Sequence, residues 1–179
     1  WFGEKFVKVP PIVRKDVDEN LHDGDMKNGV IMLSGSTFGS NVDLHGEKFP
    51  FQIDVIGREG ESSKGLTYHG KLVDNLHLLN KADFLVINAG FSAVSEGVCM
   101  RKPLIVIPVE NHAEQYINAK MVENLGIGFM SSAEEMADSI KTITQKIEEF
   151  REKCKQLHWE QCGAEEASRV ILSVFDDQK

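Results

Sequence analysis

The chain has 179 residues, of which 41% are hydrophobic and 27% charged, and its formal net charge is −8. This length suits one globular domain with a sizeable core. The negative charge argues against a general nucleic-acid or anionic-membrane surface, because both need a basic face. No apolar run approaches the roughly 18–20 residues of a membrane-spanning helix and no signal peptide is visible, so we expect a cytoplasmic protein.

The three cysteines, Cys99, Cys154 and Cys162, are an odd number without C-x-x-C spacing. They predict free thiols in a reducing compartment rather than a disulfide framework or a zinc site.

Residues 1–28 contain no periodic pattern, and Pro10-Pro11 imposes an extended path on them. We interpret this stretch as a linker. Because the chain begins at Trp1 without a methionine, we expect it to be a piece of a longer protein.

Short apolar runs alternate with helical patterns from residue 29 onward. Continuous apolar runs of this length are typical of parallel strands that are buried on both faces. The helix that follows Ser131-Ser132 is predicted to have a serine cap, and its apolar positions Ala137, Ile140, Ile143 and Ile147 to face the sheet. The pattern predicts a doubly wound α/β domain of about six parallel strands, at Gly29–Leu33, Phe51–Ile56, Leu66–His69, Phe84–Ile87, Leu104–Ile107 and, at the edge, Ile127–Met130.

The loop after the fourth run, Asn88–Glu96, is the first candidate binding site. If Ser92 caps the next helix, Glu96 lies one turn further on the same side. An anion would then meet backbone N–H groups near Ser92 and Ala93, and sugar hydroxyls would meet the Glu96 carboxylate. Spacing alone leaves open the alternative of an ordinary capped helix whose glutamate favours the positive end of the dipole.

A nucleophile elbow is a competing interpretation of the same loop, because Gly90-Phe91-Ser92 begins the pattern G-x-S-x-G. The fifth position is Val94, so the pattern fails where the smallest residue is needed. The base would be His112 or His158, for which no separate signal exists.

The loop after the fifth run, Val109–Gln115, is the second candidate. Asn111 and Glu114 match a capping box. Gln115 has no role in capping. The Glu114 carboxylate and the Gln115 amide beside it could therefore bind sugar hydroxyls. His112 is either a phosphate contact or a first-turn residue. In the helix that follows, Ala113, Ile117 and Met121 are predicted to line one apolar edge, which Val122 and Leu125 adjoin, and Gly126 ends the helix.

The turn Gly35–Ser40 is a weaker candidate. It lacks the G-K-[ST] of a P-loop and the third glycine of G-x-G-x-x-G. A close approach to a diphosphate and a simple tight turn both remain open.

Together these residues resemble the C-terminal, donor-binding domain of GT-B glycosyltransferases, in particular the family of the peptidoglycan transferase MurG and its UDP-glycosyltransferase-like relatives. The resemblance covers roughly residues 29–128. Its motifs are the Ala82-Asp83 strand, the loop Gly90–Glu96, the turn Lys102-Pro103, and Glu114-Gln115 followed by Asn118-Ala119.

The resemblance implies a nucleotide-sugar site, with UDP-sugar as substrate and no metal required. Many relatives carry histidine or arginine at the position of Asn88, so His112 becomes the candidate for charge compensation. The implied roles are diphosphate contacts at Gly90, Ser92 and Ala93, ribose at Glu96, donor sugar at Glu114 and Gln115, phosphates near Ser34, Gly35 and Ser36, and the base beside His69, Gly70, Lys71 and Leu72.

GT-B enzymes close two Rossmann-like domains over the donor, and the other domain brings the acceptor site and general base. We therefore expect a linker (1–28), a nucleotide-sugar-binding Rossmann-like domain (29–149) and C-terminal helices (150–179) of an inverting glycosyltransferase. The chain would be part of a longer or a two-component enzyme and would lack catalytic residues of its own. A membrane-associated acceptor would bind through the missing half. The alternatives are a non-catalytic nucleotide-sugar-binding subunit that needs a partner chain, and a UDP-sugar hydrolase or epimerase on the same fold.

Overall fold

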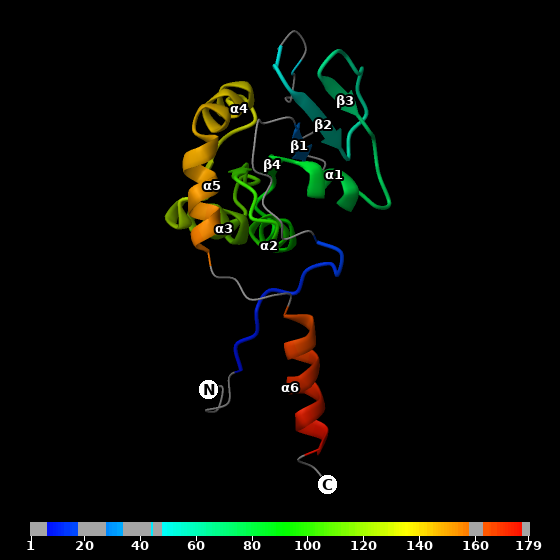
Figure 1. Ribbon diagram of the computed structural model, residues 1–179, viewed down its shortest axis with the longest axis vertical. Coiled ribbons are helices and arrows are strands. Elements are labelled where there is room, and N and C mark those ends of the chain that lie inside the picture. Colours follow the sequence, from blue (N-terminus) through cyan, green and yellow to red (C-terminus); the bar gives the residue numbers. More distant parts are fainter. Residues whose placement is uncertain (1–6, 18–27, 34–43, 45–47, 158–162, 177–179) are drawn as a thin grey trace.

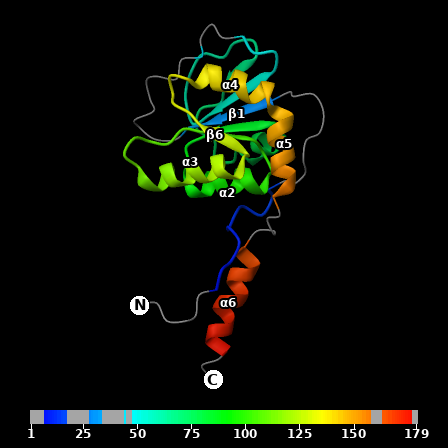
Figure 2. The same cartoon turned by 90° about the vertical axis from the view of Figure 1, so that its left-hand side faces the viewer.

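The computed structural model describes residues 7–17, 28–33, 44, 48–157 and 163–176. These residues form one parallel six-stranded sheet in the order β3-β2-β1-β4-β5-β6, with helices on both faces (Figures 1 and 2). The expectation of a doubly wound α/β domain is confirmed. The strands are β1 (Asn28–Met32), β2 (Gln52–Ile56), β3 (Leu66–Tyr68), β4 (Phe84–Ile87), β5 (Leu104–Val106) and β6 (Gly128–Met130).

The six predicted strands are therefore all present, and the bounds shift by at most one residue at either end. Every residue of β4 and β5 is buried, as their continuous apolar sequence requires. Ile127–Met130 is confirmed as an edge strand, since β6 pairs with β5 alone.

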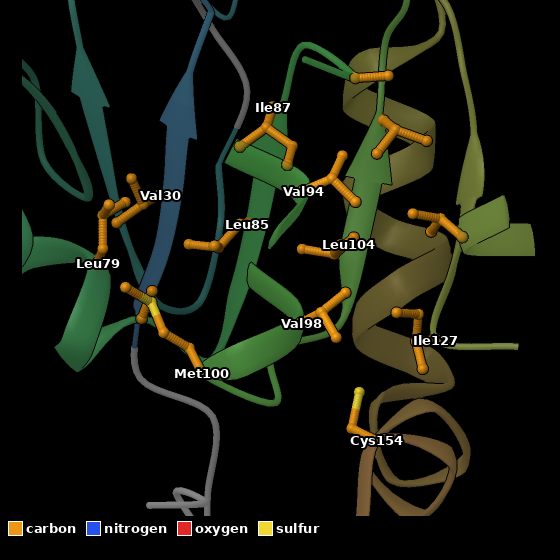
Figure 3. Packing of buried hydrophobic residues seen from close by; sticks show 14 of the residues in the cluster. Val30, Leu79, Leu85, Ile87, Val94, Val98, Met100, Leu104, Ile127 and Cys154 are labelled. Carbon is orange, nitrogen blue, oxygen red and sulfur yellow. The ribbon is translucent and has the colours of Figure 1, made fainter. Parts of the chain in front are cut away.

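The helices divide between the two faces of the sheet. One apolar cluster joins alternate side chains of β1, β4 and β5 to α1, α2 and α3, and Figure 3 shows its centre around Leu85 and Leu104. The other joins the opposite side chains to α4. The helices are α1 (Leu76–Lys81), α2 (Phe91–Cys99), α3 (Ala113–Leu125), α4 (Met136–Gln145), α5 (Ile147–Gln156) and α6 (Ala164–Asp176).

The apolar stripe predicted after residue 131 faces the sheet as expected. Ile140 and Ile143 are fully buried, and Ala137 and Ile147 pack against the same cluster. The serine cap is wrong, however. The helix α4 begins at Met136 with Glu135 as its N-cap residue, and the Ser132 hydroxyl only accepts a 3.3 Å hydrogen bond from the Glu135 N–H.

The apolar face predicted for α3 is confirmed in part: Met121, Val122 and Leu125 pack on the apolar cluster, but Ala113 and Ile117 are exposed. Ile117 is 67% exposed, whereas Ala119 and Val122 are fully buried. The helix turns the face of Ala119 and Val122 to the sheet. On the same side Asn118 binds the loop after β4 through a 2.9 Å bond to the Ala89 carbonyl. Gly126 ends α3 as predicted, with a left-handed φ of 69° that favours glycine.

A buried ion pair fastens α5 to the start of β4. Arg151 Nη2 lies 2.8 Å from Asp83 Oδ1, and the two side chains are only 3% and 6% exposed. The second Asp83 oxygen accepts a 2.9 Å bond from the Asn28 N–H at the start of β1. Because the pair is buried and hydrogen-bonded, loss of one partner would leave the other as an unpaired charge in the core. The two cysteines among the described residues, Cys99 and Cys154, are buried thiols, and burial raises the pKa of Cys154 to about 12.

The helix α6 stands away from the sheet and lies beside the N-terminal segment (Figures 1 and 2). Its start is tied to that segment, because the Gly163 N–H donates to the Pro11 carbonyl at 2.9 Å. A side chain at Gly163 would collide with the Pro10 carbonyl. On α6, Ile171, Leu172 and Phe175 are 58–65% exposed. No helix in the described part is long and apolar enough to cross a membrane.

Replacement of the buried arginine tests the role of the ion pair. Arg151→Met should lower the free energy of unfolding by about 3–5 kcal/mol, because Asp83 keeps its charge without its cation. Denaturant titration followed by circular dichroism measures this loss.

Arg169→Met is the matched control. Arg169 forms a 3.0 Å pair with Glu166 on α6, where the side chains are 71% and 41% exposed, so the loss should stay below about 1 kcal/mol. Equal losses in the two variants would contradict the role assigned to Asp83–Arg151.

Candidate functional site

The topology itself marks one crevice at the carboxyl ends of the strands. From β1 the chain proceeds outward to β2 and β3, and from β4 it proceeds in the other direction to β5 and β6. Adjacent strands whose connections leave in opposite directions open a crevice at their carboxyl ends, where ligands of such sheets bind. In this chain the crevice lies beyond Met32 and Ile87.

The N-terminus of α2 opens into this region. The N-cap residue of α2 is Gly90, which has no side chain to cap the helix. The predicted Ser92 cap is therefore wrong, and Ser92 is an exposed residue of the first turn. Gly90 has an ordinary φ of −67°, and a Cβ built on it would meet no described atom within 4 Å. No described residue fills the space beside Gly90, and the first-turn N–H groups of the helix lack intrahelical acceptors.

Glu96 lies one turn further along α2 and is bound by a residue from the N-terminal segment. Arg14 Nε donates to Glu96 Oε1 at 2.6 Å and Arg14 Nη2 donates to Oε2 at 2.8 Å. The Glu96 side chain is 13% exposed and Arg14 39%. The hydrogen bond with Glu96 raises the pKa of the Arg14 guanidinium above its ordinary value.

The loop between β5 and α3 differs from the predicted capping box. The N-cap residue of α3 is His112, whose Nδ1 accepts a 3.4 Å bond from the Gln115 N–H. Asn111 adopts a left-handed φ of 59°. Glu114 reaches across to α2 instead, where its Oε1 accepts from the Phe91 N–H at 3.4 Å.

Gln115 also has a structural duty that its sequence position did not reveal. Its Oε1 accepts a 2.8 Å bond from the Val109 N–H and so closes the loop. A hollow of about 430 Å³ lies beside this loop. Its lining consists of residues 108–113 and Tyr116.

Two asparagines hold the loop after β4 in place. Asn118 of α3 binds the Ala89 carbonyl, and the buried Asn88 donates to the Ile107 carbonyl at 3.2 Å. Asn88 thus links β4 to the chain after β5. The resemblance singled out Asn118 only as part of a motif, and its bond to Ala89 spans 29 residues.

The third group of predicted residues lies beyond β3. His69 Nε2 is 2.8 Å from Asp54 Oδ1, and the His69 N–H donates to the Val55 carbonyl at 2.9 Å. Gly70 has a left-handed φ of 60°, and a Cβ there would meet the Glu59 carboxylate. Lys71 and Leu72 are exposed. Asp54 was not among the predicted residues, since a lone acidic residue in a strand carries no signal.

The structure thus brings together two of the predicted groups, the start of α2 and the loop before α3, through the contact of Glu114 with Phe91. Ser34, Gly35 and Ser36 lie outside the described residues, as does His158 of the hydrolase interpretation. The other histidine of that interpretation, His112, uses Nδ1 to cap α3. Within the described ranges no group of three or more His, Cys, Asp or Glu side chains could hold a metal ion.

Known proteins resemble this chain in sequence. A UDP-N-acetylglucosamine–N-acetylmuramyl-(pentapeptide) pyrophosphoryl-undecaprenol N-acetylglucosamine transferase of Geobacillus kaustophilus is 26% identical over 98% of this chain and 56% of its own length. The uncharacterized UDP-glucosyltransferase YojK of Bacillus subtilis is 32% identical over 99% of this chain and 48% of its own length. The chain spans about half the length of these relatives.

Solved structures share the fold. The MurG of Acinetobacter baumannii superposes with a TM-score of 0.59 at 17% identity, over 91% of this chain and 54% of that one. At this identity the likeness concerns the fold, which is that of one part of a GT-B glycosyltransferase.

The model of the family described as glycosyl transferase family 1 matches residues 4–148. This range includes the N-terminal segment with Arg14, the whole sheet and both loops of the candidate site. The chain therefore belongs to glycosyl transferase family 1.

Proposed function

We propose that this chain is the nucleotide-sugar-binding half of an inverting glycosyltransferase, with a UDP-sugar as donor. One observation carries the proposal: the N-terminus of α2 opens at the crevice between β1 and β4, where no described residue fills the space beside Gly90 and a carboxylate lies one turn along. Backbone N–H groups at a helix N-terminus suit a diphosphate, and a carboxylate at the spacing of Glu96 suits the ribose hydroxyls.

The mechanism assigned to this half is electrostatic. As the bond to the sugar breaks, negative charge grows on the leaving diphosphate. The first-turn N–H groups of Ser92 and Ala93 and the dipole of α2 stabilise that charge, as an oxyanion hole does. Asn118 supports this arrangement because it fixes the Ala89 carbonyl directly before the turn. His112 is the candidate hydrogen-bond donor to the phosphates, because Nδ1 accepts the capping bond and the ring proton therefore lies on Nε2.

The donor sugar is assigned to the hollow of about 430 Å³ next to the loop before α3. Glu114 and Gln115 adjoin this hollow in sequence, but each uses one oxygen to bind a backbone N–H. The second carboxylate oxygen of Glu114 and the NH₂ group of Gln115 are then the groups for sugar hydroxyls. The base of the nucleotide is assigned to the loop from His69 to Leu72, in which Asp54 contacts His69 and Lys71 and Leu72 are exposed.

The general base and the acceptor site are assigned to another domain or subunit. The family relatives are about twice as long as this chain, and α6 exposes three large apolar side chains beside the N-terminal segment. Such a surface is typical of a protein contact. We assign it to the second half of the transferase.

A non-catalytic subunit that presents a nucleotide sugar to a partner is the second candidate. It uses the same site and the same exposed helix, so binding data alone do not separate it from the transferase half. Transfer by the full-length protein without any added subunit would exclude it.

Nucleotide binding is the first test. Isothermal titration calorimetry should detect UDP binding to this chain alone, with no transfer of sugar to any acceptor or to water. An absence of UDP binding at millimolar concentration would refute the proposal, and hydrolysis of UDP-sugar by the isolated chain would favour a hydrolase.

The ribose role of Glu96 is tested with two ligands. Glu96→Ala should weaken UDP about 10-fold or more, because a hydrogen bond to a charged group contributes about 1.5–3 kcal/mol, while pyrophosphate binding should not weaken. Calorimetry measures both affinities. Glu149→Gln, an exposed carboxylate on α5, should alter neither affinity, and equal losses for the two ligands in Glu96→Ala would contradict the ribose role.

The exposed face of α6 is tested by a triple substitution, Ile171→Gln, Leu172→Gln and Phe175→Gln. Because all three side chains are more than half exposed, the thermal midpoint of this chain should stay within the small range of surface changes. Co-purification with a separately produced preceding region of the same gene product should be lost.

The matched control replaces Glu166 by Gln and Ser173 by Ala, which helix geometry puts roughly opposite the three apolar residues on α6, and should leave co-purification intact. Equal retention of the partner by the triple variant would contradict the assignment of α6.

A further inference from the structure

Arg14 and Glu96 form a two-pronged contact across 82 residues of sequence. The Nε–H and one Nη2–H of the guanidinium each donate to a different oxygen of the carboxylate, at 2.6 and 2.8 Å. This parallel geometry fixes both the position and the plane of the carboxylate, which a lysine ammonium cannot do.

Arg14 is itself held in place by its surroundings. Its Nη1 donates to Asn75 Oδ1 at 2.9 Å, and Asn75 Nδ2 lies 3.1 Å from Met32 Sδ at the end of β1. Two residues further along, the Asp16 carbonyl accepts a 3.1 Å bond from Asn80 Nδ2. The guanidinium is thus bound by Asn75 at the start of α1, and the backbone that carries it is bound at the other end of α1, so its orientation does not depend on a ligand.

The contact fixes Glu96 without saturating it. Each carboxylate oxygen has two lone pairs, and Arg14 uses one on each, so two hydroxyl groups can still donate to the outer side of the carboxylate. The cation also offsets the charge of Glu96. A lone carboxylate near a diphosphate would repel it, and this repulsion grows in a partly buried site.

A contribution to the stability of the fold does not by itself account for the Arg14–Glu96 pair. Arg14 is 39% and Glu96 13% exposed, and a partly exposed ion pair contributes only modestly to the free energy of unfolding. Its two-pronged geometry and its location on the carboxylate assigned to ribose both point to orientation instead.

We propose that Arg14 is a positioning residue of the nucleotide site, which holds the Glu96 carboxylate in the orientation that binds a ribose hydroxyl pair and neutralises its charge beside the diphosphate. This inference rests on the proposed function, because it needs Glu96 to contact ribose. It makes the N-terminal segment part of the binding site rather than a connection to it.

The test uses this chain as it is, with UDP, 2′-deoxy-UDP and inorganic pyrophosphate as probes in calorimetry. The ratio of the 2′-deoxy-UDP and UDP dissociation constants reports ribose recognition, and we expect about tenfold for the unaltered chain. In Arg14→Met and in Arg14→Lys the ratio should fall toward one, while the pyrophosphate affinity of Arg14→Lys stays unchanged. The double variant Glu96→Ala/Arg14→Met should have the same ratio as Glu96→Ala alone.

The control is Arg169→Met, which removes an exposed Arg–Glu pair on α6 and should retain the tenfold ratio. Thermal melts establish that each variant is folded; if Arg14→Met fails to fold, Arg14→Lys and Asn75→Ala carry the test, and both should lower the ratio.

Four outcomes would overturn the inference. A ratio unchanged in Arg14→Lys and Asn75→Ala would refute it. Equal losses for all three probes in a folded Arg14 variant would assign Arg14 to the phosphates or to general structure. Tighter UDP binding in Arg14→Met would make Arg14 a competitor of the ribose. Failure of the unaltered chain to bind UDP would refute the proposed function together with this inference, whereas the first three outcomes leave UDP binding standing.

Discussion

Burial of both faces of β4 is the constraint on which the rest of the structure depends. All four of its side chains, Phe84 to Ile87, are at most 1% exposed, and the three of β5 are fully buried. Strands in this position cannot offer a side chain to a ligand. Polar groups that serve a ligand are therefore confined to the ends of the strands, and the exposed edge at the carboxyl ends is where the connections to α2 and α3 diverge.

The same constraint explains the charge at the other end of β4. Asp83 precedes the strand, is 6% exposed, and is matched by Arg151 from α5 and by the Asn28 N–H from β1. Without these partners, burial of the Asp83 carboxylate would destabilise the fold. The sheet thus has a structural polar cluster at the amino ends of its strands and a ligand-binding edge at the carboxyl ends.

The strands and the fold class were predictable from the sequence because their signal is local. A continuous apolar run such as Leu104–Ile107 can be satisfied only by burial on both faces, whatever the rest of the chain does. The stripe containing Ile140 and Ile143 was predictable for the same reason. The order of the strands was not a local property, but parallel strands with alternating helices leave few arrangements.

The caps were predicted wrongly, because α2 finds an acceptor in Glu114, which is distant in sequence, and α3 is capped by a histidine, which is not among the favoured N-cap residues. Ser92 and Asn111 both have side chains that favour N-caps, yet α2 begins after Gly90 and α3 after His112. In the folded chain Glu114 supplies an acceptor to the first N–H of α2, and Gln115 closes the loop before α3. These contacts across 23 and 6 residues replace the capping box that the pattern suggested.

Glu96, the carboxylate assigned to ribose, illustrates both what was predictable from the sequence and what was not. Its place on α2 followed from helix spacing, since Glu96 lies four residues after Ser92 wherever the helix is capped. Its partner Arg14 lies in a segment interpreted as a linker, and nothing in the local pattern connects the two. The segment is not a neutral connection, however: Val17 packs on the main apolar cluster, Pro11 binds the start of α6, and the family match itself begins at residue 4. The domain boundary at residue 28 stays a prediction. The candidate site extends across that boundary, because Arg14 before it orients the Glu96 carboxylate after it.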